Sequence, residues 1–172
     1  MSPHETQTPI WRRALTSQFG AALDMFANAI RACPEPLWDD PGVPVARRFW
    51  YLAYHTLFWL DRYLEEREEA HVPPPPYTLG ELDPAGVYPE RTYTREELLD
   101  YLAYGRERCR RALGSLDEER AGRRCGFARL ELTVLELHLY SCRHVQHHTA
   151  QLQLLLRQGD VVPPRWVGLG KP

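Results

Sequence analysis

Four long segments of the sequence carry apolar residues at the three- and four-residue spacing of an amphipathic α-helix. Stretches that contain proline and glycine separate these segments, and no stretch keeps up the apolar-polar alternation of a half-buried β-strand. The pattern predicts an all-α chain with helices over about residues 9–32, 44–69, 94–116 and 133–158, and the Thr-x-x-Glu sequences at 94–97 and 133–136 predict a capping box at the start of the last two. At about 1.5 Å of rise per residue, these helices have the length of a four-helix bundle. We therefore expect a single domain over residues 1–172.

The lengths of the connections between the helices indicate the topology of the bundle. Residues 33–43 and 117–132 are suited to joining antiparallel neighbours. Residues 70–93 include the run Pro73-Pro74-Pro75-Pro76 and are long and stiff enough to carry the chain back along the whole bundle. We expect an up-down-down-up topology with a packed crossover between the second and third helices. In the alternative, this connection is a flexible lid, which fast proteolysis within it would reveal.

Composition and charge disfavour several classes of protein. The chain has 21 Lys and Arg against 23 Asp and Glu, so it lacks the positive field of a dedicated nucleic-acid binder. The first ten residues do not resemble a secretory signal, and no apolar run is long enough to span a bilayer, so we expect a cytoplasmic protein with no membrane partner. Cysteines 33, 109, 125 and 142 have no CxxC spacing, and we interpret them as reduced thiols.

Histidines are concentrated near the end of the chain, where residues 138, 144, 147 and 148 are all histidine. His144 and His148 are four residues apart, so on a helix they project from one face and can bind the same metal ion. His55 is the natural third ligand, because it lies mid-way along an aromatic-rich helix that should turn it inward. Three neutral histidines leave coordination positions open for water, which is typical of a catalytic site.

The alternative interpretation is structural, because histidine is common on helix surfaces and also occurs in cores bonded to a carbonyl. We place His144 and His148 on a buried inner face, where their polar nitrogens need partners and a shared cation supplies them. Gln151 either orients a ligand or bound water, or simply bridges two helices. His147 either flanks the site or is partly exposed and supports a ligand from outside it; no acid or base for catalysis is identified, and His147 is the nearest candidate. We expect His138 to pack or reach solvent, and we do not expect Cys142 to be a ligand.

Two stretches together resemble the DinB/YfiT-like superfamily. They are YLAYHTLFWLDRYL over residues 51–64 and RHVQHHTAQ over residues 143–151. The resemblance covers nearly the whole chain. It implies an up-down-down-up bundle in which one histidine of the second helix and two of the fourth bind a divalent metal, often zinc or nickel. Matched residue by residue, the implied ligands are His55, His144 and His148, the same three that the spacing indicates.

The resemblance also implies a range of functions. Relatives include transferases and isomerases that use low-molecular-weight thiols, so we expect a metal-dependent enzyme that transfers a thiol to an electrophilic small molecule, or else a metal-assisted hydrolase. Thr149 and Ala150 replace the arginine and glycine common in the family, which leaves the substrate open. The rival is a non-catalytic, stress-associated or ligand-binding dimer with a structural metal or none. Many members are homodimers, and Trp50 and Tyr54 are candidates for such an interface.

Overall fold

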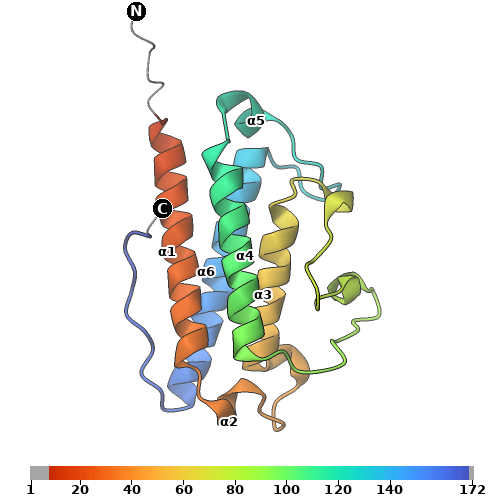
Figure 1. Ribbon diagram of the computed structural model, residues 1–172, viewed down its shortest axis with the longest axis vertical. Coiled ribbons are helices and arrows are strands. Elements are labelled where there is room, and N and C mark those ends of the chain that lie inside the picture. Colours follow the sequence, from red (N-terminus) through yellow and green to blue (C-terminus); the bar gives the residue numbers. More distant parts are fainter. Residues whose placement is uncertain (1–7, 171–172) are drawn as a thin grey trace, which may run out of the picture.

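A computed structural model of the chain describes residues 8–170. Four long helices lie side by side in it (Figure 1). They are α1 (Ile10–Ala32), α3 (Phe49–Tyr63), α4 (Arg95–Gly114) and α6 (Val134–Gln158). Two short helices, α2 (Glu35–Trp38) and α5 (Glu118–Gly122), lie in the connections. The predicted all-α class is confirmed, because residues 8–170 contain isolated β-bridges but no strand. No helix in this range is long and apolar enough to cross a membrane.

The long helices pack in a ring in which α1 and α3 each contact both α4 and α6. In the view of Figure 1, α1 and α6 run downwards and α3 and α4 run upwards. The connection between α3 and α4 returns from one end of the helices to the other. This arrangement is compatible with the predicted up-down-down-up bundle and its crossover. We use "the crossover" below for residues 70–93.

The second predicted helix is the one whose ends differ most from the structure. Residues 45–47 form a separate 3₁₀ turn, and Arg48 is extended because its guanidinium bonds to the Val43 carbonyl at 2.8 Å and to Asp39 at 2.7 Å. At the other end, α3 stops at Tyr63, and Glu66 has a φ of 58°, which a helix cannot accommodate. The other three long helices begin and end within two residues of the prediction.

Trp50 and Tyr54 do not form a candidate dimer interface, and that interpretation is corrected. Their side chains belong to the core, with relative exposures of 3% and 1%. The indole of Trp50 donates to Asp39 at 2.9 Å, and the ring of Tyr54 packs against Tyr77 and Tyr93. The reason is that the long connection between α3 and α4 covers this side of α3, which the periodicity of α3 alone does not reveal.

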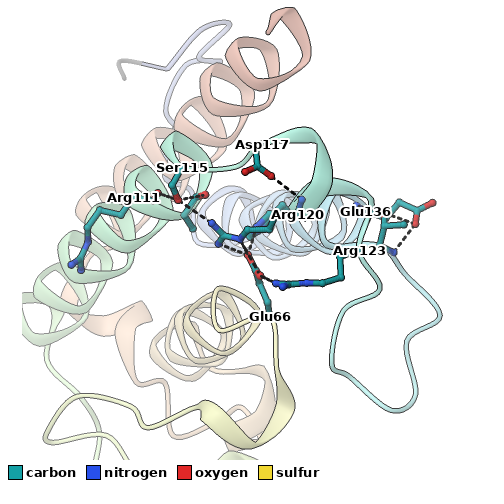
Figure 2. A network of polar contacts seen from close by, with 10 residues as sticks. Glu66, Arg111, Ser115, Asp117, Arg120, Arg123 and Glu136 are labelled. Atoms are coloured by element: carbon teal, nitrogen blue, oxygen red, sulfur yellow. Dashed lines mark hydrogen bonds and ion pairs between the residues drawn. The ribbon is translucent and has the colours of Figure 1, made fainter. Parts of the chain in front are cut away.

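A polar network around Glu66 joins the end of α3 to α5 and α6 (Figure 2). Arg120 donates to Glu66 through Nε at 2.9 Å and through Nη1 to Ser115 at 2.9 Å. Burial acts to raise the pKa of Glu66, but bonding to His138 and Arg120 outweighs it and lowers this pKa to about 2. The network therefore holds α3 against α6, the two helices that carry the candidate ligands. The network also explains why His138 is fully buried, because its Nε2 lies 3.5 Å from the Glu66 carboxylate.

Helix α6 begins with a capping box that the sequence predicts. The Thr133 hydroxyl accepts from the Glu136 N–H at 3.3 Å, and the Glu136 carboxylate accepts from the Thr133 N–H at 2.8 Å. We expect Thr133→Ala to lower the free energy of unfolding by about 1 kcal/mol, because an N–H at the helix start loses its partner. Urea denaturation followed by circular dichroism measures this. Thr133→Ser keeps the hydroxyl and serves as the control; an equal loss in both variants would contradict the assignment to the cap.

Candidate metal centre

Three histidines from two helices meet on one side of the bundle. His55 comes from α3, and His144 and His148 come from successive turns of α6. Their ligating nitrogens lie within 4.8 Å of one another, and the Nε2 atoms of His144 and His148 are 3.1 Å apart. All three are half-buried. The structure therefore brings together the three residues that the spacing and the resemblance indicate.

The outer nitrogens of two of these rings are already engaged. His148 Nδ1 lies 2.6 Å from Gln151 Oε1, and His55 Nδ1 contacts the carboxylate of Glu81. When each Nδ1–H donates to its oxygen, the lone pair of Nε2 is left free to face the centre of the group. His144 Nδ1 is buried and has no hydrogen-bond partner among the described residues. Gln151 thus contacts the ring of His148, and the role of orienting this ligand stays a prediction.

The geometry fits a divalent metal. Zinc binds imidazole nitrogen at about 2.0–2.1 Å, so two nitrogens on one ion are separated by about 3.0–3.4 Å, depending on the coordination geometry. The 3.1 Å between the Nε2 atoms of His144 and His148 falls in this range. Burial, followed by the neighbouring imidazoles, lowers the pKa of His144 from 6.5 to about 3. Burial likewise lowers the pKa of His148 to about 4. Both rings are therefore neutral at pH 7, as metal ligands must be.

The histidines do not lie on the central buried stripe of α6, which corrects one expectation about the inner face. That stripe consists of Val134, Leu137, His138, Ser141, Val145, Thr149, Leu152 and Leu156. His144, His148 and Gln151 lie at its edge and remain half-buried. The helix is rotated relative to the prediction because Val145 and Thr149, rather than the imidazoles, fill the centre of the bundle. As a result the site is open to solvent on one side.

A surface pocket of about 550 Å³ lies beside His144 and is lined entirely by α6. Its other lining residues include Tyr140, Arg143 and His147. His147 is exposed, and its ring packs edge-on against that of His148 with centroids 5.0 Å apart. A small molecule in this pocket would contact His144 and His147 together. The pocket therefore places His144 and His147 side by side on one solvent-facing surface of α6.

The four cysteines do not join this group. All are free, and Cys142 is the least buried of them. Burial raises the pKa of Cys142 to about 11 and that of Cys109 to about 12. Thiols with such pKa values are protonated at pH 7 and are poor nucleophiles and ligands. The expectation of reduced thiols agrees with the four free cysteines.

Sequence reasoning missed Glu81, which belongs to the surroundings of the site. It lies in the crossover, in a 3₁₀ turn over Leu79–Leu82, and its carboxylate contacts His55 Nδ1 and the hydroxyl of Tyr51. No spacing or motif marks it, because it is separated from His55 along the chain and is not on a regular helix. Only the path of the crossover brings it to α3.

Comparison with known families adds independent evidence. A family model described as the DinB superfamily matches residues 18–152, a range that contains all three histidines, Glu81 and Gln151. A search of curated proteins found no match. The family match covers well over half of the chain and extends from within α1 to within α6. The chain belongs to the DinB superfamily.

Proposed function

We propose that this protein is a metal-dependent enzyme in which His55, His144 and His148 hold one divalent cation, zinc or nickel. One observation carries the proposal: imidazoles from two helices converge, with the Nε2 atoms of His144 and His148 3.1 Å apart. Imidazole accepts several first-row metals, and family membership favours a divalent ion. The scaffold in this proposal is a single up-down-down-up bundle in which α3 and α6 supply the ligands.

The proposed reaction is transfer of a low-molecular-weight thiol to an electrophilic small molecule. A divalent cation, when bound, lowers the pKa of a coordinated thiol or water so that its conjugate base exists near neutral pH. On the protein side, Arg143 and His147 line the adjacent pocket, where a guanidinium attracts an anionic group and an imidazole exchanges protons. His147 is thus the candidate acid or base. Metal-assisted hydrolysis is the second reaction that the same arrangement supports.

The rival function is that of a non-catalytic, stress-associated or ligand-binding dimer with a structural ion or none. A structural zinc site is usually closed by a fourth protein ligand. Within residues 8–170, the group that includes these histidines contains no Asp, Glu or Cys, and the nearby Glu81 is occupied by His55 and Tyr51. This favours an open, catalytic site. A homodimer stays a prediction from the resemblance, and Trp50 and Tyr54 no longer support it.

The first experiment measures metal content by mass spectrometry on untagged, gently purified protein, and again after reconstitution with zinc or nickel. We expect about one metal ion per chain, because one group of three imidazoles is available. The loaded protein is then screened with thiols and electrophiles, with the metal-free protein as control. Protein that binds no metal even after reconstitution would contradict the proposed site. Metal-loaded protein without activity in a broad screen would favour the non-catalytic rival.

A further inference from the structure

Glu81 is a buried carboxylate whose two oxygens both contact α3. Its side chain is only 5% exposed. Oε1 contacts His55 Nδ1, and Oε2 accepts from the Tyr51 hydroxyl at 2.9 Å. Tyr51 and His55 are four residues apart and so lie on the same face of α3. Burying a carboxylate is costly unless it is hydrogen-bonded, so these two contacts determine where the carboxylate can stay.

The crossover holds Glu81 in this position through contacts of its own. The 3₁₀ turn over Leu79–Leu82 is capped by Thr78, whose hydroxyl accepts from the Gly80 N–H at 3.3 Å. Further along, the ring of Tyr88 packs edge-on against Tyr51, with centroids 5.1 Å apart. On the other side of Glu81 in the sequence, the Tyr54 hydroxyl donates to the Thr78 carbonyl at 3.5 Å, so the crossover contacts α3 both before and after Glu81. Movement of the crossover away from α3 would remove the partner of His55 Nδ1.

The contact with Glu81 determines how His55 faces the other two histidines. A carboxylate accepts a hydrogen bond from Nδ1–H and thereby selects the tautomer whose Nε2 carries the free lone pair. It also fixes the plane of the ring and makes Nε2 a stronger electron donor. Glu81 is not itself placed among the ligands, because both of its oxygens are occupied. Its influence on the site acts through His55.

We propose that Glu81 is a positioning residue that prepares His55 for metal binding and so links metal binding to the docking of the crossover on α3. This inference rests on the proposed metal site, and it names the crossover as the segment that influences how tightly the site binds its ion. Linkage is reciprocal: if the docked crossover strengthens metal binding, bound metal stabilises the docked crossover by the same free energy. The crossover then undocks more readily in the metal-free protein than in the metal-loaded one.

The first test measures zinc affinity by competition with a chromophoric chelator. We expect Glu81→Ala to bind zinc about 10 to 100 times more weakly than the wild type, the usual effect of removing a residue that orients a ligand. Glu81→Gln keeps an oxygen that accepts from His55 Nδ1–H, so its affinity should lie between the two. Glu90→Gln, an exposed carboxylate of the same crossover, is the matched control and should bind as the wild type does.

The second readout is hydrogen exchange of residues 70–93 with and without zinc. Zinc should slow exchange there in the wild type and in Glu90→Gln, but have a clearly smaller effect in Glu81→Ala. Equal zinc affinity in wild type and Glu81→Ala, or equal protection of the crossover by zinc in both, would overturn this inference and leave the metal site standing. Failure of the wild type to bind zinc or nickel would overturn the proposed site, and this inference with it.

Discussion

Replacing His144 with alanine is expected to lower the affinity for zinc or nickel by about a hundredfold or more, because one of three imidazole ligands is lost. Structural zinc sites with four ligands bind with about 10–16 kcal/mol, or roughly 3 kcal/mol for each ligand, and about 1.4 kcal/mol corresponds to tenfold. The helices should remain, since the substitution removes a half-buried ring whose Nδ1 has no partner among the described residues. Competition titration measures the loss of metal affinity, and circular dichroism measures whether the helices remain.

His147→Ala is the matched control for this substitution. His147 lies on the same helix, next to His148 in the sequence, but it is exposed and outside the group of converging nitrogens. We expect its loss to leave metal affinity within a few-fold of the wild type and, if it is the acid or base, to reduce turnover. Wild-type affinity in His144→Ala, or equal losses in both variants, would mean that these imidazoles do not share an ion.

Most of the helical architecture follows from local signals in the sequence. Helices α4 and α6 begin at Thr-x-x-Glu capping boxes, and both boxes form as predicted. The ends of α3 could not be predicted in this way. Arg48 is extended because of its contacts with Asp39 and Val43, and Glu66 turns the chain where Arg120 and His138 bind it. The partners of Glu66 are distant in sequence, and those of Arg48 lie in the irregular connection before it, so neither set carries a periodic signal.

Some residues of the candidate site can likewise be predicted from local sequence spacing, and others cannot. His144 and His148 are predictable because a four-residue step on a helix guarantees one face. His55 required a guess about packing that the resemblance supports and the structure places within reach. Glu81 was missed because its role depends on the path of an irregular segment. The rotation of α6 that puts Val145 in the core and His144 at its edge was also missed, because histidine and valine suit the inner face equally well by period alone.

Replacing Asp61 with alanine is expected to lower the free energy of unfolding by about 3 kcal/mol or more. Asp61 is a fully buried carboxylate of α3. It forms an ion pair with Arg108 of α4 and accepts from the Tyr101 hydroxyl at 3.1 Å. His71 Nδ1, from the crossover, is 3.7 Å away. Alanine leaves the buried Tyr101 hydroxyl without its acceptor, and Arg108 keeps only the carboxylate of Glu65. Chemical denaturation followed by circular dichroism measures the loss.

Asp24→Ala is the control, because Asp24 also joins two long helices through an arginine. It pairs with Arg106 at 2.7 Å, but the two side chains are 31% and 36% exposed. Water can solvate the groups left behind, so the expected loss is less than about 1 kcal/mol. Similar losses for Asp24→Ala and Asp61→Ala would contradict the argument that burial makes the difference. A large loss for Asp61→Ala alone would show that the buried carboxylate, unlike the exposed one, holds its helix pair together, because water cannot solvate the groups that it leaves behind.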